Sequence, residues 1–339
     1  MNPSLDATAI AVLRCFPQAH PITPIEMSTI AGGFSGATIW LVETLLGRFC
    51  LRAWPPGMTE ARLAFIHVAQ RELTAARVLI TPQLLTSHSQ MTWEAAAGRY
   101  WEVSSWQPGV ADFHQRPSQA RLRNALRSLA QVHSVWAKRK DAAFEPSEAV
   151  IRRFGRLKAW TREQFGQAET VIQGAEAQVR ALLTEALACL RQNQPFVIAA
   201  LEPWLSRPLP QQCVLADVWH DHLLFTGDDV TGLVDFGSAR LDNVAVDLAR
   251  LLESCVGQDQ ASWATAVACY REQTHFGDQW EGLMRTLIKT GPYVGLEAWL
   301  RWLLVEKRHF ADADRVRTRL QELLAPTRMK VHWLSEQAE

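Results

Sequence analysis

The sequence lacks an excess of charge of either sign, because 35 Lys and Arg residues balance 35 Asp and Glu residues. Binding to nucleic acid or to an anionic membrane calls for a basic patch or stripe, so we expect neither partner. Its six cysteines include no C-x-x-C pair, which argues against a zinc knuckle or a disulfide framework. The first residues lack a basic start before an apolar core, and no apolar run reaches the roughly 20 residues of a membrane-spanning helix. We therefore expect a cytoplasmic protein with a small-molecule partner.

The secondary-structure pattern changes along the chain. Alternating, β-branched segments and Gly-rich turns from Glu26 to Leu51 predict antiparallel strands, and a helix is expected at Thr59–Val78. A further strand pair is expected around Leu84–Ser87 and Arg99–Ser105. The remainder reads as mainly helical, including the block Glu148–Arg191, and one hairpin interrupts it. This order predicts an α+β protein in two lobes, an N-terminal lobe of residues 1–105 and a C-terminal lobe of residues 106–339.

The hairpin V-L-A-D-V-W-H-D-H-L-L-F-T-G-D-D-V-T-G-L-V-D-F-G gathers most of the notable polar residues. Its apolar segments predict two short strands joined by the turn T-G-D-D. If Phe225 pairs with Val230, continuing the ladder places Asp235 opposite His220 and close to His222. The open end of the hairpin then carries two carboxylates, Asp217 and Asp235. Such a pair can hold a metal-bound polyphosphate and accept a proton from a hydroxyl, whereas turn chemistry alone explains Asp228 and Asp229.

This segment resembles the catalytic part of the aminoglycoside phosphotransferase family of small-molecule kinases. The resemblance rests on D-x-W-H-D-H-L-L-F, on D-F-G at Asp235–Gly237 and on V-D-L-A-R-L-L at Val246–Leu252. It implies a protein-kinase-like fold with a small antiparallel sheet in the N-terminal lobe and a larger, mainly helical C-terminal lobe. It also implies that Asp217 accepts the proton of the acceptor hydroxyl and that Asp235 binds magnesium.

The resemblance extends to the nucleotide side of the site. A-G-G-F-S-G occupies the place of the family's phosphate loop, which implies phosphate contacts from four residues, Gly32, Gly33, Ser35 and Gly36. Arg52 stands on the strand where protein kinases carry a lysine, so it is the candidate for the α- and β-phosphates. The segment before Q-P-G matches the hinge, which implies adenine contacts from the backbone of Ser104, Ser105 and Trp106.

The helix that should supply a partner for Arg52 offers three candidates. Glu60, Glu72 and, by its spacing to Pro82, His67 compete for that place. The sequence leaves the choice among them open.

Three positions depart from the family's H-G-D-x-x-x-x-N pattern. Leu215 and Ala216 replace its His and Gly, and His222 replaces the metal-binding Asn. Magnesium prefers oxygen donors, whereas imidazole suits softer metals. Three alternatives follow: Asp235 carries the metal while His222 hydrogen-bonds a phosphate or a water, the site prefers manganese, or the protein binds nucleotide with little turnover.

Three functions remain in competition. The first is an ATP- or GTP-dependent phosphotransferase that uses Mg²⁺, or Mn²⁺, to phosphorylate a hydroxyl of a small molecule. The second is a kinase-like module that binds nucleotide with little or no turnover. The third is a metal-dependent hydrolase built on His220 and His222, which an extended strand would present on one face. The identity of the acceptor and the oligomeric state stay open.

Overall fold

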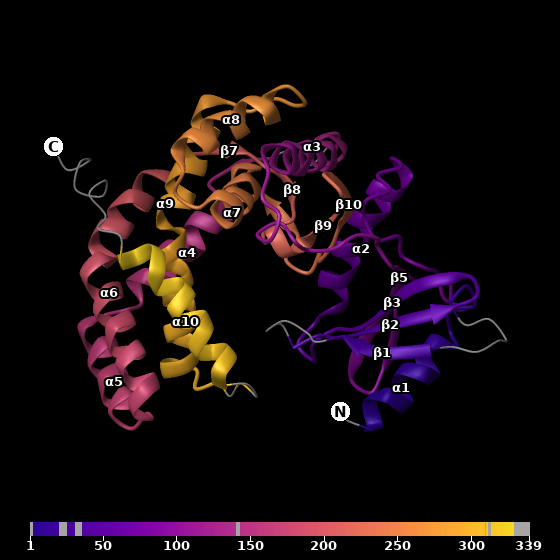
Figure 1. Ribbon diagram of the computed structural model, residues 1–339, viewed down its shortest axis with the longest axis horizontal. Coiled ribbons are helices and arrows are strands. Elements are labelled where there is room, and N and C mark those ends of the chain that lie inside the picture. Colours follow the sequence, from indigo (N-terminus) through magenta and orange to yellow (C-terminus); the bar gives the residue numbers. More distant parts are fainter. Residues whose placement is uncertain are drawn as a thin grey trace. The chain divides into compact units, whose positions relative to one another are not determined.

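The computed structural model describes residues 3–19, 26–30, 36–139, 143–308, 310 and 313–328 (Figure 1). It divides into two compact units. Unit 1 comprises Met1–Lys140, Leu215–Arg240 and Ala268–Thr274, and unit 2 comprises Asp141–Val214, Leu241–Val267 and His275–Glu339. The hairpin with the predicted catalytic residues therefore belongs to the same unit as the N-terminal sheet.

The centre of unit 1 is a five-stranded antiparallel sheet with the order β1-β2-β3-β5-β4 (Figure 1). The strands are β1 (Glu26–Ile30), β2 (Thr38–Thr44), β3 (Gly47–Ala53), β4 (Glu94–Ala96) and β5 (Arg99–Ser105). One face is apolar: Trp40 stacks on Trp101 with ring centroids 5.4 Å apart, and α1 (Pro3–Leu13) contributes Val12 and Leu13 to this core. Because side chains alternate along a strand, Arg52 lies on the face opposite to buried Leu51.

Two longer helices also belong to unit 1. α2 (Glu60–Ala75) begins at Thr59, whose hydroxyl accepts the Arg62 N–H at 3.3 Å, and α3 (Gln119–Trp136) begins in the same way at Ser118. The predicted helix at Thr59–Val78 is thus confirmed with a shorter end. The predicted strand around Leu84–Ser87 is wrong, because this segment forms only a single bridge from Leu84 to Ser104, and β4 takes its place as the partner of β5.

The hairpin that carries the predicted catalytic residues consists of β9 (Leu223–Thr226) and β10 (Asp229–Leu233), preceded by the 3-10 turn η2 (His220–His222). Val230 pairs with Phe225, as predicted, but the register shifts by one residue between Val230 and Gly232. The expected pairing of Asp235 with His220 is therefore wrong. The bulge is held because the Thr231 hydroxyl donates to the carbonyl of Pro108 at 2.9 Å.

Unit 2 is mainly helical, as the sequence pattern indicates. Its helices are α4 (Glu148–Lys158), α5 (Arg162–Gln173), α6 (Ala177–Leu201), α7 (Ala245–Val256), α9 (Asp278–Leu300) and α10 (Ala313–Arg328), and α8 (Gln260–Arg271) ends in unit 1. Short elements complete it: η1 (Glu202–Trp204), the π-helix η3 (Arg301–Val305), and the strand pairs β6 (Phe144–Glu145) with β7 (Leu209–Pro210) and β8 (Gln212–Val214) with β11 (Arg240–Asp242). Among the described residues, no helix combines the length and apolar character needed to cross a bilayer.

Candidate active site

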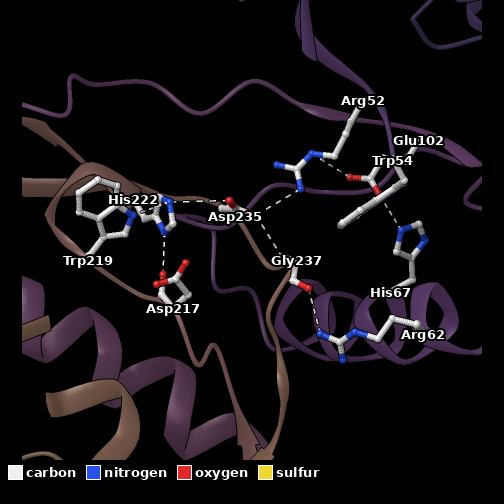
Figure 2. A network of polar contacts seen from close by, with 10 residues as sticks. All are labelled: Arg52, Trp54, Arg62, His67, Glu102, Asp217, Trp219, His222, Asp235 and Gly237. Carbon is white, nitrogen blue, oxygen red and sulfur yellow. Dashed lines mark hydrogen bonds and ion pairs between the residues drawn. The ribbon is translucent and has the colours of Figure 1, made fainter. Parts of the chain in front are cut away.

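Asp235 lies two residues after the end of β10, and three groups surround its carboxylate (Figure 2). Oδ1 accepts the N–H of Gly237 at 3.2 Å and lies 3.4 Å from Nη1 of Arg52, while Oδ2 lies 3.7 Å from Nε2 of His222. Its backbone adopts φ +65°, an uncommon conformation for a residue with a side chain. Burial would raise the pKa of this carboxyl, but the Arg52 cation and the hydrogen bonds outweigh it and lower the pKa. The side chain is ionised at neutral pH and still 42% exposed.

His222 has both ring nitrogens engaged within its own loop. Nε2 accepts the indole N–H of Trp219 at 2.8 Å, and Nδ1 lies 2.8 Å from the carbonyl oxygen of Asp217 (Figure 2). Because a carbonyl only accepts and an indole N–H only donates, these contacts match the tautomer with its proton on Nδ1. The lone pair that would bind a metal is therefore occupied by Trp219. The imidazole ring of His222 therefore contacts the Asp217 backbone carbonyl on one side and faces the Asp235 carboxylate on the other.

The loop before Asp217 compensates for one departure from the family pattern. Ala216, at the place of the family's Gly, has φ +64°, in the left-handed region that glycine adopts most easily. The backbone therefore keeps a glycine-like conformation although the residue is alanine.

Arg52 has an ion-pair partner that sequence reasoning missed. On the neighbouring strand, Glu102 is its register partner, and its Oε1 lies 3.8 Å from Nε of Arg52. The other oxygen, Oε2, accepts the indole N–H of Trp54 at 2.7 Å and lies 2.7 Å from Nε2 of His67. Burial would raise the pKa of Glu102, but the bonds from His67 and Trp54 and the Arg52 cation lower it. The cross-strand position of Glu102 follows from the order β3-β5, which local sequence patterns do not reveal.

None of the three predicted partners pairs directly with Arg52. Glu72 pairs with Arg139 at 3.2 Å, and His67 contacts Glu102 rather than the guanidinium, so neither of these two α2 residues is the direct partner of Arg52. Among the ion pairs of the described residues, those of Arg52 are with Glu102 and Asp235, so Glu60 is not a partner either.

α2 also holds the D-F-G segment through Arg62 (Figure 2). Its Nη2 donates to the carbonyl of Gly237 at 2.9 Å, and its Nη1 donates to the carbonyl of Ala239. Two arginines from different elements thus fix the loop that carries Asp235.

The predicted nucleotide-binding backbone is described only in part. Gly32, Gly33 and Ser35 lie outside the described residues. Gly36 has φ +78°, and its carbonyl accepts Nη1 of Arg99 at 3.3 Å, so β5 holds the end of the Gly-rich segment.

Two backbone N–H groups of the predicted hinge already donate to other backbone carbonyls. Ser105 donates its N–H to Gln83 at 2.9 Å, Trp106 donates to Arg48 at 3.0 Å, and Ser104 is buried. Adenine contacts from these three residues stay a prediction, and contacts through the two N–H groups would have to replace these bonds.

A divalent metal fits the carboxylate of Asp235 better than the ring of His222. Asp235 offers an ionised, partly exposed oxygen donor of the kind that Mg²⁺ prefers, whereas Nε2 of His222 is already an acceptor for Trp219. His220 and His222 lie on a 3-10 turn rather than on the extended strand that the hydrolase hypothesis requires. Throughout the described ranges, no group of three or more His, Cys, Asp or Glu side chains is placed to hold a metal. The 3-10 turn therefore does not present the two histidines as the zinc-hydrolase hypothesis requires.

An aspartate in a D-F-G segment, an arginine on β3 that contacts it and an aspartate on the preceding loop form an arrangement typical of small-molecule kinases with a protein-kinase-like fold. Residues 26–284 match the phosphotransferase enzyme family, and the chain belongs to that family.

Curated relatives include two homoserine kinases. That of Methylobacterium radiotolerans is 28% identical over 245 residues, or 72% of this chain and 69% of that protein. That of Methylobacterium sp. strain 4-46 is 29% identical over 225 residues, or 66% of this chain and 63% of that protein. The chain thus spans about two thirds of the length of these relatives.

Solved structures of related enzymes share the fold. Amicoumacin kinase hAmiN, in complex with AMP-PNP, Ca²⁺ and Ami, gives a TM-score of 0.63 at 12% identity over 98% of this chain and 97% of that chain. An aminoglycoside phosphotransferase from Alicyclobacillus acidocaldarius gives 0.60 at 16% identity over 97% and 95% of the two chains. At such identities the likeness establishes the protein-kinase-like α+β fold, which confirms the predicted fold class.

Proposed function

We propose that the protein transfers the γ-phosphate of ATP or GTP to a hydroxyl group of a small molecule. One observation carries the proposal: within unit 1, ionised Asp235 contacts Arg52 at 3.4 Å and faces His222, whose ring holds the backbone of Asp217. This arrangement brings the Arg52 cation beside the ionised carboxylate of Asp235, which supports a site for a metal-bound polyphosphate. Phosphoryl transfer depends mainly on such positioning and on neutralising the phosphate charge.

Each residue has a distinct role in this proposal. Asp235 would hold a divalent cation, Mg²⁺ or alternatively Mn²⁺, which neutralises the β- and γ-phosphates when bound. Arg52 contacts the phosphates, together with the backbone of Gly32, Gly33, Ser35 and Gly36. Asp217 orients the acceptor hydroxyl and accepts its proton. His222 keeps the loop of Asp217 in place through its hydrogen bonds to Trp219 and to the Asp217 carbonyl, and it does not ligate the metal.

The acceptor is proposed to be a small alcohol, and homoserine is the first compound to test. This choice rests on the names of the homoserine kinases, which the chain matches over about two thirds of their length. The proposal also includes a cytoplasmic location, which the six free cysteines support.

A kinase-like module without turnover is the second candidate. It is favoured by His222, whose Nε2 is occupied by Trp219, and by Leu215 at the place of the family's His.

Thermal unfolding and product formation together test the proposal. The protein is unfolded with ATP, GTP or ADP, each with Mg²⁺, with Mn²⁺ or with chelator, and ADP or GDP release is followed with homoserine and a panel of small alcohols. Nucleotide at about 100 times its Kd stabilises by about 2.7 kcal/mol, which raises the Tm of a body of this size by a few degrees.

The outcomes separate the candidates. A metal-dependent shift that Asp235→Ala weakens, together with acceptor-dependent ADP release, supports the phosphotransferase. A shift without release for any acceptor supports the module without turnover. No shift with any nucleotide, in folded and nucleotide-free protein, would overturn both.

A further inference from the structure

We propose that Glu102 is the positioning residue for Arg52, so that the phosphate-side cation is anchored within the sheet and not by a carboxylate of α2. This inference rests on the proposed function, since Arg52 acts on nucleotide phosphates. α2 contacts this pair through His67, whose ring binds the carboxylate of Glu102.

The register of β3 and β5 places Arg52 and Glu102 opposite each other. Arg52 on β3 and Glu102 on β5 are direct cross-strand partners, and their side chains are only 13% and 6% exposed. Cross-strand partners have Cβ atoms about 5 Å apart, so the backbone ladder starts these two side chains next to each other. A shift of α2 relative to the sheet would leave the separation of these two Cβ atoms unchanged.

The carboxylate of Glu102 is itself held in one orientation. Oε2 accepts the Trp54 indole N–H at 2.7 Å and lies 2.7 Å from Nε2 of His67, which leaves Oε1 toward Arg52. The carboxylate only accepts, so Nε2 of His67 donates, and Nδ1 contacts the Thr92 hydroxyl at 2.7 Å. The two donors thus restrict rotation of the Glu102 carboxylate.

Trp54 supports the arginine as well as its partner. The Arg52 guanidinium lies 4.9 Å from the centroid of the Trp54 ring. A cation on an aromatic face and a fixed carboxylate together define where the two Nη groups point. One of these groups, Nη1, lies 3.4 Å from Asp235. The anchor therefore aims Arg52 at the carboxylate proposed to hold the metal.

A matched pair of substitutions tests the anchor. We expect Glu102→Gln to raise the Kd of ATP with Mg²⁺ by about tenfold to a hundredfold, the usual range for a residue that orients a ligand-binding group. Glu72→Gln, the same change in α2, should leave the Kd within about twofold, because Glu72 pairs with Arg139. Calorimetry without acceptor gives the Kd values, and thermal unfolding without nucleotide checks that each variant is folded.

A double-mutant cycle separates positioning from general structural support. If Glu102 acts through Arg52, adding Glu102→Gln to Arg52→Ala causes no further loss of affinity. If Glu102→Gln does not fold, Glu102→Asp, which keeps the charge, replaces it in the cycle, and we expect a smaller loss that again disappears in the Arg52→Ala background.

Two results would overturn the inference while leaving the proposed function intact. One is wild-type affinity in the folded Glu102 variant. The other is an equal loss with and without Arg52. Absence of nucleotide binding by the wild-type protein would instead overturn the proposed function, and the inference with it.

Discussion

Asp217 and Asp235 have different surroundings, and the difference separates their roles. Asp235 contacts Arg52 and the N–H of Gly237, which favours the charged form needed for a metal. Asp217 is tied through its backbone carbonyl to Nδ1 of His222, so its loop is fixed independently of its carboxyl group. Substitutions of the Asp217 carboxyl should therefore affect the chemical step and leave nucleotide binding in place.

We expect Asp217→Asn to lower kcat by about 100- to 10,000-fold, the usual contribution of a general base, with an unchanged Kd for nucleotide. Steady-state rates and calorimetry measure the two quantities. Asp228→Asn in the exposed hairpin turn is the control and should retain wild-type rates. A comparable loss of nucleotide affinity in Asp217→Asn would show that Asp217 has another role.

Trp219 should control whether the ring of His222 can bind a metal. Trp219→Phe keeps an aromatic ring but removes the N–H that occupies Nε2 at 2.8 Å. A hydrogen bond of this kind contributes about 1 kcal/mol, so its loss should strengthen metal binding by Nε2 by up to about fivefold. Because imidazole suits Mn²⁺ better than Mg²⁺, nucleotide affinity with Mn²⁺ should improve relative to Mg²⁺ by up to about that factor. An unchanged ratio of the two Kd values would mean that His222 stays outside the metal shell.

At the scale of elements, the catalytic hairpin depends on close packing against the segment after β5. A Cβ added to Gly109 would lie 2.5 Å from the Thr231 hydroxyl and 3.0 Å from the backbone N and O of Phe225, and Gly109 has φ +102°. This approach allows the bridge between Val110 and Phe225. Glycine is therefore required here for two separate reasons.

We expect Gly109→Ala to lower the free energy of unfolding by about 3 kcal/mol, combining backbone strain with overpacking. Gly98→Ala is the matched control: Gly98 also has a positive φ, +69°, but nothing lies within 4 Å of an added Cβ. Its cost should be about 1 kcal/mol. Urea unfolding of both variants gives the comparison, and equal losses would contradict the role of the close approach.

The hairpin also shows where sequence patterns are sufficient and where they fail. Apolar runs and turn residues predicted the two strands and the Phe225–Val230 pair, because those signals are local. The bulge was not predictable, because it depends on how Gly232 fits against Leu224 and Gln107, where an added Cβ would lie within 3.0 Å of both. Glu102 was missed for the same reason, since strand order is a property of the whole sheet.

Helix α9 buries a carboxyl group that makes stability depend on pH. Glu297 is fully buried; Oε1 accepts the Trp160 indole N–H at 3.1 Å and lies 3.3 Å from Nε of Arg301, whereas Oε2 has no hydrogen-bond partner. Burial raises the pKa of Glu297 despite these contacts. A raised folded-state pKa stabilises the protein fully below the ordinary value of about 4.3, and this contribution is lost as pH rises through the folded-state pKa.

Glu297→Gln should therefore gain stability relative to wild type as pH rises from about 4 and reach a plateau above the folded-state pKa. Unfolding free energies of both proteins between about pH 4 and 8 test this. Glu322→Gln, in exposed Glu322 of α10, controls for removal of a carboxylate and should show no such rise. Parallel pH profiles for Glu297→Gln and wild type would contradict the assignment.

At the scale of the whole molecule, the sequence order alone predicted an α+β chain, because a β-rich start and a helical remainder are properties of long segments. The boundary at residues 105 and 106 stays a prediction. Tertiary contacts join Leu215–Arg240 to the N-terminal sheet in unit 1, although more than 100 residues of intervening chain separate them. Such a return of the chain leaves no local signal in the sequence.

The described residues of the proposed nucleotide site, Gly36, Arg52 and Asp235, belong to unit 1, and so do Asp217 and His222. Nucleotide without acceptor should therefore slow amide hydrogen exchange most strongly in β3, β5 and residues 215–240. At about 100 times its Kd, nucleotide slows by about a hundredfold the amides whose opening requires its release. Asp235→Ala should lose this protection at the same nucleotide concentration. Slowing confined to α4, α5 and α6 of unit 2 would place the nucleotide elsewhere, because local protection follows the contacts that the ligand makes.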